Sequence, residues 1–166
     1  MIKIIEGNIV DAQTDYIIHQ VNCQGEMNTG VAKALRDYDE GIYIHYRNVC
    51  KLREFNPELL LGTYDEYFIR RKNQGILSLF AQDMYGYDGK QYTDVKAFQE
   101  GLNFIRQQIP VYWFDADNRP HKTTIALPYK IGCGRGGADW EVVYKIIEEE
   151  LSSFKVELWK LEEQNV

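Results

Sequence analysis

The sequence lacks the features of several common protein classes. Its three cysteines, Cys23, Cys50 and Cys133, are odd in number and have no metal-like spacing. A disulfide framework is therefore not indicated, and reduced thiols in the cytoplasm are expected. No run approaches the roughly 20 apolar residues of a membrane-spanning helix, and the N-terminus lacks the basic and apolar regions of a secretory signal. Neither export nor a membrane partner is indicated.

Positive charge is also scarce. The chain has 19 lysines and arginines against 25 acids, which gives a net charge of −6, and the basic residues are scattered. A nucleic-acid-binding protein normally has a basic face, so direct sequence-specific nucleic-acid binding is not expected. An anionic small ligand is still compatible with this charge, because backbone N–H groups and helix N-termini bind phosphate.

Internal repeats, low-complexity segments and linkers are absent as well. The chain has 166 residues, of which 45% are hydrophobic, so it can bury a core without disulfides or metals. We expect one domain over residues 1–166.

The chain does contain alternating strand-like and helix-like segments. Short apolar runs predict strands at residues 1–5, 16–21, 63–69, 76–81, 123–127 and 156–161. Apolar residues at helical spacing predict helices at 28–38, 42–52, 93–108 and 139–151, with Thr93 as an N-cap. A surface hairpin is expected over 110–122. The alternation, with local pairing in the middle, predicts a three-layer α/β fold around a mixed sheet.

Two strand-to-helix segments are rich in glycine. The first, residues 21–32, reads Val-Asn-Cys-Gln-Gly-Glu-Met-Asn-Thr-Gly-Val-Ala; the second, residues 128–140, reads Pro-Tyr-Lys-Ile-Gly-Cys-Gly-Arg-Gly-Gly-Ala-Asp-Trp. Ligands of α/β sheets collect at such strand ends. Glycine lets the backbone approach a ligand closely, and free N–H groups at a helix start favour a diphosphate. Together the loops predict a pyrophosphate site, although each alone is equally compatible with a tight turn.

Two other phosphate-binding motifs are rejected. Gly132, Gly134 and Gly137 match the Gly-x-Gly-x-x-Gly spacing of a dinucleotide-binding Rossmann unit. Only one helix and one strand follow them, which is too little chain for the two halves of that fold. A Walker loop is excluded because Gly-Lys-Ser and Gly-Lys-Thr do not occur. No cofactor is indicated.

Metal binding is not expected either. His45 and His121 have no cysteine or acid at ligand spacing. Asp115, Asp117 and Asn118 suggest a calcium loop, but the later glycine and glutamate of that motif are missing, so a surface hairpin is the better interpretation.

Three stretches resemble the macrodomain family in order and spacing. They are residues 4–9 (Ile-Ile-Glu-Gly-Asn-Ile), residues 17–25 (Ile-Ile-His-Gln-Val-Asn-Cys-Gln-Gly) with Gly30-Val31-Ala32, and residues 127–134 with Trp140. The resemblance covers nearly the whole chain. The most similar branch contains the glutamate-linked ADP-ribose hydrolases and the yeast-type ADP-ribose 1″-phosphate phosphatase.

This resemblance implies that the chain binds ADP-ribose or a derivative, and that an ADP-ribosylated macromolecule is a further partner. It leaves three possibilities open: a hydrolase or phosphatase, a reader module without catalysis, and a protein that binds another nucleotide made from NAD.

The resemblance also implies roles for individual residues. Asn8 stands where the family commonly has an aspartate that accepts from the adenine amino group, and Ile9 offers backbone to the same base. The first loop would enclose the distal ribose and one phosphate, and the second would wrap the diphosphate. Gln82 and Tyr85 follow a core strand near the distal ribose. The full predicted binding set is Asn8, Ile9, Asn22, Gly25, Asn28, Thr29, Gly30, Val31, Ala32, Gln82, Tyr85, Ile131, Gly132, Cys133, Gly134, Arg135, Gly136 and Gly137.

The catalytic pattern departs from that of the relatives. The glutamate-specific hydrolases use a lysine after the central strand and an aspartate within the second glycine loop. Here residues 80–84 contain no lysine and residues 134–137 contain no aspartate, and Asp139 is interpreted as a first-turn helix residue. His19 matches a histidine that the resemblance associates with phosphatase chemistry, and a histidine of near-neutral pKa acts as an acid or base on phosphate. His19 is therefore the candidate catalytic residue, with a strand histidine bonded to a carbonyl as the alternative.

Overall fold

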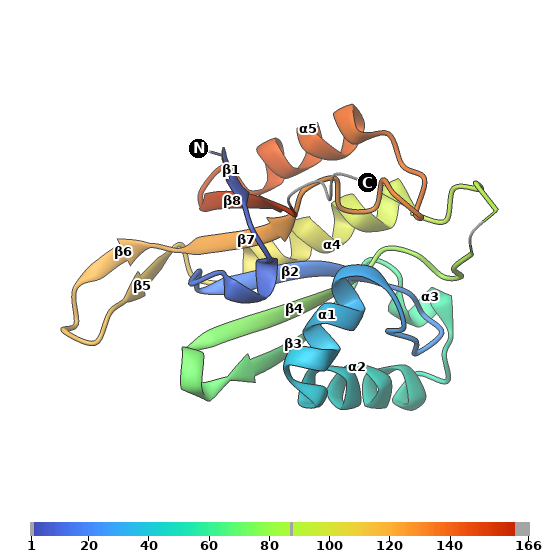
Figure 1. The fold of residues 1–166 in the computed structure, drawn as a ribbon, viewed down its shortest axis with the longest axis horizontal. Helices are drawn as coiled ribbons and strands as arrows, with labels where there is room; N and C mark the ends of the chain where they lie inside the picture. The colour runs from blue at the N-terminus through green and yellow to red at the C-terminus, as the bar shows by residue number, and fades with distance from the viewer. Residues whose placement is uncertain (1, 87, 162–166) are drawn as a thin grey trace.

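The computed structural model of this chain describes residues 2–86 and 88–161. It contains a six-stranded sheet with helices on both faces (Figure 1). The strands are, in spatial order, β1 (Ile2–Glu6), β8 (Lys155–Lys160), β7 (Thr124–Pro128), β2 (Tyr16–Val21), β4 (Gln74–Phe80) and β3 (Tyr64–Ile69). Neighbouring strands are parallel except for β3 and β4, which are antiparallel. The predicted mixed α/β sheet is confirmed.

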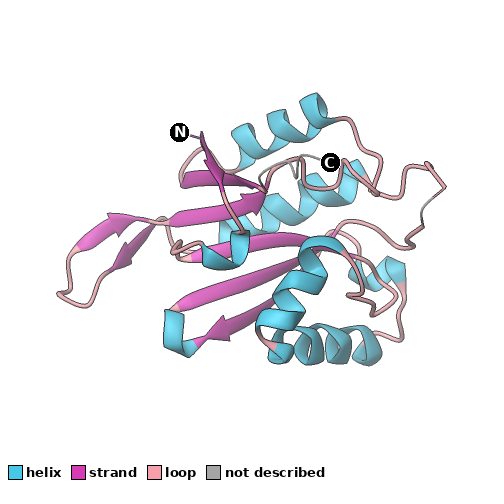
Figure 2. Cartoon of the chain, in the orientation of Figure 1, coloured by secondary structure: helices cyan, strands magenta, loops and turns pink. Residues whose placement is uncertain are grey.

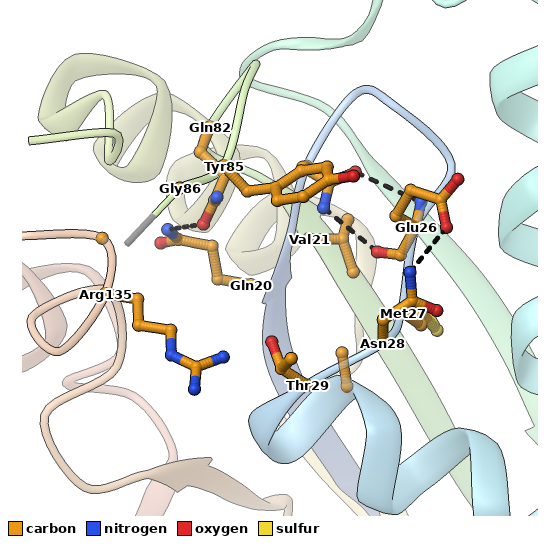
Figure 3. A pocket seen from close by; sticks show the side chains of 13 residues that line it. Gln20, Val21, Glu26, Met27, Asn28, Thr29, Gln82, Tyr85, Gly86 and Arg135 are labelled. Atoms are coloured by element: carbon orange, nitrogen blue, oxygen red, sulfur yellow. Dashed lines mark hydrogen bonds between the residues drawn. The ribbon is translucent and has the colours of Figure 1, made fainter. Parts of the chain in front are cut away.

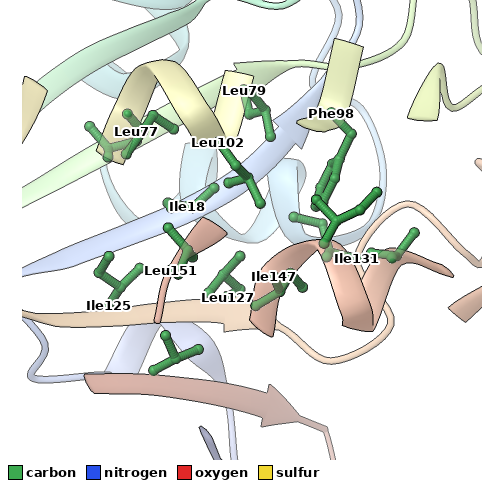
Figure 4. Close-up of a cluster of buried hydrophobic side chains, with 14 of the residues drawn as sticks. Ile18, Leu77, Leu79, Phe98, Leu102, Ile125, Leu127, Ile131, Ile147 and Leu151 are labelled. Atoms are coloured by element: carbon green, nitrogen blue, oxygen red, sulfur yellow. The ribbon is translucent and has the colours of Figure 1, made fainter. Parts of the chain in front are cut away.

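The helices form the two outer layers (Figures 1 and 2). One layer contains α1 (Gly30–Tyr38), α2 (Glu40–Leu52) and α3 (Pro57–Leu60), and the other contains α4 (Val95–Gln108) and α5 (Trp140–Glu150). Successive side chains of a strand point to opposite faces, so Ile17 packs in the α1–α2 layer and Ile18 in the α4–α5 layer. Figure 4 shows the second of these clusters, in which Ile18 and Leu127 of the sheet lie close to helix residues such as Leu102.

Most element boundaries lie within two or three residues of their predicted positions. The short helices η1 (Ile9–Asp11), α3 and η2 (Arg70–Lys72) were not predicted. The predicted surface hairpin is confirmed as β5 (Tyr112–Phe114) and β6 (Pro120–Lys122), which project from the body of the molecule (Figure 1). Met1, in the first predicted strand, lies outside the described residues.

The predicted N-cap of α4 is wrong by one residue. The carboxylate of Asp94 accepts from the backbone N–H of Ala97 at 3.0 Å, so Asp94 is the cap. The hydroxyl of Thr93 instead donates to the backbone oxygen of Gly132 at 2.8 Å. The side chain of Thr93, which the sequence predicted to cap α4, therefore makes a tertiary contact with the second glycine loop instead.

The central strands determine where a site can form. β2 pairs with β4 along its whole length, from Tyr16 opposite Gly75 to Val21 opposite Phe80. With β7 it pairs only at Tyr16 and Ile17, so β2 and β7 separate toward their carboxyl ends. The loops that follow β2, β4 and β7 meet at this opening. No helix in the described part of the chain is long and apolar enough to cross a membrane.

Candidate functional site

A cleft lies where β2 and β7 separate. It consists of two adjoining hollows of about 120 and 410 Å³. Figure 3 looks into the smaller hollow, where the side chain of Arg135 extends from the second glycine loop toward Gln20 and Thr29. The hollows adjoin, and six residues line both of them: Gln20, Thr29, Ala32, Gln82, Arg135 and Gly136.

The start of α1 forms one wall of the cleft. Thr29 is its N-cap by position, but the hydroxyl makes no capping hydrogen bond. Every other α-helix of the described chain has a side-chain cap, supplied by Asp39, Asn56, Asp94 and Asp139. The first N–H groups of a helix have no partner within it. Those of Gly30, Val31 and Ala32 have no acceptor among the described residues, and all three residues line the larger hollow.

Side chains hold the first glycine loop in place. The Oδ1 atom of Asn22 accepts from the N–H groups of Gln24 and Glu26 at 3.0 and 3.3 Å. The hydroxyl of Tyr46 lies 2.6 Å from the backbone oxygen and 2.8 Å from Oδ1 of Asn22, and it accepts from the Gly25 N–H at 3.1 Å. Gly25 therefore faces α2 and lines neither hollow.

The second glycine loop forms the opposite wall. Its backbone oxygens at Gly132 and Gly136 point away from the cleft: the first accepts from the hydroxyl of Thr93 at 2.8 Å, and the second from the N–H groups of Tyr92 and Thr93 at 2.8 and 2.9 Å. The N–H groups of Gly134 and Gly136 have no acceptor in residues 2–86 or 88–161, and both residues line the larger hollow. Two sets of available N–H groups thus border the same cleft.

Amides and a hydroxyl lie between the walls. The Nε2 group of Gln20 donates to Oε1 of Gln82 and to Oγ1 of Thr93, each at 2.8 Å. The Oε1 atom of Gln20 is buried and has no partner among the described residues. Tyr85 lies at the rim with 46% of its surface exposed. The predictions missed Gln20, although a polar residue at the end of an apolar strand was a usable signal.

His19 is part of the cleft floor, but it is buried. It is 1% exposed, and its Nε2 lies 2.8 Å from Oγ of Ser78, whereas Nδ1 has no partner in the described structure. Burial lowers the pKa of His19 to about 3, so the ring is neutral at pH 7. A neutral buried ring is a poor proton donor to phosphate. The catalytic role of His19 stays a prediction that this environment disfavours, and the expected carbonyl partner is replaced by Ser78.

Few charged groups line the cleft. In the smaller hollow these are Glu26 and Arg135, and Glu26 accepts from the side-chain amide of Asn28 at 2.9 Å. Asp139, interpreted from the sequence as a first-turn residue, is the N-cap of α5 and accepts from the Glu141 N–H at 2.9 Å. No group of three or more histidine, cysteine, aspartate or glutamate side chains suited to a metal occurs in the described chain.

The structure brings most of the predicted binding set together. The cleft is lined by Asn22, Asn28, Thr29, Gly30, Val31, Ala32, Gln82, Tyr85, Ile131, Gly132, Gly134, Arg135 and Gly136. Residues that line it but were not predicted to bind include Gln20, Val21, Glu26, Met27, Gly86, Pro128, Tyr129 and Lys130. Most of these lie within the predicted loops or next to them in sequence.

Five predicted residues line neither hollow. Asn8 is exposed and its Oδ1 accepts from the Val10 N–H at 3.2 Å, while Ile9 is buried in the core. Gly25 faces α2, and Cys133 directs its thiol toward the backbone oxygen of Ile131. Gly137 lines a neighbouring hollow with Gly134 and Arg135. Binding roles for these five residues remain predictions.

Comparison with known proteins gives matches in sequence and in fold. No family model matches the chain. A curated DNA ADP-ribosyl transferase–DNA ADP-ribosyl glycohydrolase fusion protein of Thermosipho africanus (strain H17ap60334) is 20% identical over 93% of this chain. The chain spans about 40% of the length of that relative.

Solved structures match the fold over nearly the whole chain. The macrodomain of Thermus aquaticus DarG is 24% identical with a TM-score of 0.72, and the match covers 98% of each chain. Thermosipho africanus DarTG in complex with ADP-ribose is 17% identical with a TM-score of 0.73, and the match covers 99% of this chain and 43% of the other.

Proposed function

We propose that this chain, which has the macrodomain fold, binds ADP-ribose or a derivative of it in the cleft between the two glycine loops. The observation that carries the proposal is the pair of N–H sets, from residues 30–32 on one wall and from Gly134 and Gly136 on the other. Such groups, together with the positive end of the α1 dipole, favour an anion without a cluster of lysines. A diphosphate presents oxygens on both sides and so engages both walls at once.

The rest of the ligand follows from the lining of the cleft. The smaller hollow offers the amides of Asn28 and Gln82 and the ring of Tyr85, which suit the hydroxyl groups of the distal ribose. Adenine would then lie beyond the larger hollow. The oxygen of Asn8 has a second lone pair beside the one used by Val10, so its predicted contact with the adenine amino group is still available.

The relatives support binding as the primary function. One matching structure is a complex with ADP-ribose, and the curated relative is a DNA ADP-ribosyl transferase–DNA ADP-ribosyl glycohydrolase fusion protein. Removal of ADP-ribose from a macromolecule is accordingly a second candidate function. Transferase activity is not proposed, because this chain matches only part of that relative.

One carboxylate would serve a hydrolytic function. Glu26 is the single acid among the residues that line the two hollows. If the protein hydrolyses an ADP-ribosyl bond, we propose Glu26 as the general base that activates water. We expect Glu26→Gln to lose turnover while it retains ADP-ribose binding; unchanged turnover on a hydrolysed substrate would remove this role.

Calorimetric titration with ADP-ribose tests the binding proposal, with AMP and NAD as comparison ligands. We expect saturable binding in the micromolar range, about −8 kcal/mol, and at least about tenfold tighter than for AMP. No heat at millimolar ADP-ribose would contradict the proposal.

Gly134→Ala is the matched variant for this titration. A Cβ atom at Gly134 meets no protein atom within 4 Å, so the added methyl group enters open space beside the larger hollow without disturbing the fold. We expect affinity for ADP-ribose to fall by about tenfold, which corresponds to 1.4 kcal/mol, with an unchanged melting temperature.

A further inference from the structure

A third segment holds the second glycine loop from outside the cleft. Thr93 is 3% exposed, and its hydroxyl donates to the backbone oxygen of Gly132 at 2.8 Å. The N–H groups of Tyr92 and Thr93 both donate to the backbone oxygen of Gly136. Residues 92 and 93 therefore fix two backbone oxygens of the loop.

The same hydroxyl links the loop to the central sheet. While it donates to Gly132, it accepts from Nε2 of Gln20 at 2.8 Å. Gln20 lies in β2, and its amide also donates to Gln82 after β4. The hydroxyl of Thr93 thus uses both its donor and its acceptor capacity, and it joins β2, the segment after β4 and the second loop.

The close packing of Thr93 and Gln20 against the second loop explains why glycine stands at positions 132 and 136. A Cβ atom on Gly136 would overlap Oγ1 of Thr93 and lie 2.5 Å from the backbone oxygen of Gly132. A Cβ atom on Gly132 would lie 2.8 Å from Oε1 of Gln20 and 3.1 Å from Oγ1 of Thr93. Real Cβ atoms do not approach within 3.0 Å, so the contact with Thr93 requires glycine at 136; at 132 the nearest atom is the oxygen of Gln20, and a positive φ of 75° also favours glycine.

We propose that Thr93 is a positioning residue for the anion site. Its contacts fix the peptide groups 132–133 and 136–137, and these bracket the groups that carry the N–H donors of Gly134 and Gly136. With both ends fixed, the donors stay directed at the cleft before a ligand arrives, and less ordering free energy is lost on binding. The effect on ADP-ribose binding rests on the proposed function, whereas the effect of Thr93 on the second loop does not depend on any ligand.

Thr93→Val removes the hydroxyl and keeps the side-chain shape, and Thr93→Ser keeps the hydroxyl. We expect the valine variant to bind ADP-ribose at least tenfold more weakly than the wild type in calorimetry. The serine variant should remain within about threefold of it.

Thr123→Val is the matched control. Thr123 is also buried and its hydroxyl donates to a backbone oxygen, that of Pro110, at 2.7 Å, but it lies at the base of the hairpin. The Thr123→Val variant should be less stable than the wild type and should keep wild-type affinity for ADP-ribose. Wild-type affinity in Thr93→Val would overturn the proposal.

Amide hydrogen exchange gives a reading that needs no ligand. The N–H groups of Gly137 and Ala138 are bonded within the loop, so their exchange reports whether it keeps its shape. We expect faster exchange at these amides in Thr93→Val but not in Thr123→Val. Unchanged exchange would overturn the positioning role even if the wild type fails to bind ADP-ribose, a failure that would count against the proposed function alone.

If Thr93→Val does not fold, Thr93→Ala is measured in the same two assays. It removes the hydroxyl without placing a second methyl group beside Gly132. Weaker ADP-ribose binding with faster loop exchange supports the proposal, and wild-type values in both assays overturn it.

Discussion

The first glycine loop is held by side chains, whereas the second is held by its backbone and by residues 92–93. Asn22 and Tyr46 make the side-chain hydrogen bonds of the first loop, and Gly25 there has a positive φ of 77° and packs against Phe55. In the second loop, Gly136 packs so closely against Thr93 and Gly132 that it does not accept a side chain. The two loops thus offer N–H groups to one cleft but are fixed differently: the first mainly by the side chains of Asn22 and Tyr46, the second by close packing on residues 92–93.

The largest effect is expected for an added methyl group in the second loop. Gly136→Ala forces Thr93 and Gly132 apart, and we expect the free energy of unfolding to fall by about 3 kcal/mol in urea denaturation. Gly134→Ala, two residues away, places its methyl group in open space and should change stability by less than about 0.5 kcal/mol. Equal stability of the two variants would contradict the account of this loop.

Deletion of a hydroxyl group tests the first loop. Tyr46→Phe keeps the ring that stacks on Phe80 but leaves the Gly25 N–H and Asn22 without their partner. We expect a loss of about 2 kcal/mol in the free energy of unfolding, because buried polar groups stay unsatisfied. Tyr43→Phe is the control, since the Tyr43 hydroxyl has no hydrogen-bond partner in the described structure. A similar loss in both variants would show that the hydroxyl of Tyr46 does not hold the loop.

The pH dependence of stability tests the floor that the two loops share. The folded-state pKa of His19 is about 3, below the 6.5 of a free histidine, so the unfolded chain binds a proton that the folded chain does not. The contribution of His19 is therefore complete above about pH 6.5 and is lost as the pH falls from there toward 3. Between about pH 6.5 and 5.5, stability should fall by up to about 1.4 kcal/mol more in the wild type than in His19→Gln.

Urea denaturation at several pH values measures this difference. A wild-type slope in His19→Gln would mean that His19 is not buried as a neutral ring.

The smallest effect is expected for the charged side chain of the second loop. Arg135 lines both hollows, but the backbone N–H groups are expected to carry most of the anion binding. We expect Arg135→Gln to weaken ADP-ribose binding by about threefold, or less than 1 kcal/mol, and to reduce its salt dependence in titrations. Arg119→Gln, on the hairpin, is the control of equal charge change. A loss of a hundredfold or more would mean that the side chain, rather than the backbone, makes the site.

The sequence predicted the features that depend on local residue patterns. Apolar runs and helical spacing located the six strands of the sheet and the four longer helices, and the glycine content marked both loops. Because the carboxyl ends of parallel strands lie at one edge of a sheet, a common site for the two loops was also expected, but the strand order that brings β2 beside β7 was not predicted.

Features that depend on tertiary contacts were not predictable in this way. Thr93 has the residue type of a helix cap, yet Gly132 and Gln20 take its hydroxyl. His19 has the residue type of an acid–base group, yet its burial keeps it neutral. The separation of β2 from β7, which opens the cleft, has no signature in either strand.

The central claim is that both loops contact one ligand, and amide NMR shifts during an ADP-ribose titration test it most directly. We expect the amide signals of Gly30, Val31 and Ala32 and those of Gly134 and Gly136 to shift together and to saturate at the same ligand concentration. Shifts confined to one loop, or saturation at clearly different concentrations, would contradict the claim that the two walls hold one diphosphate.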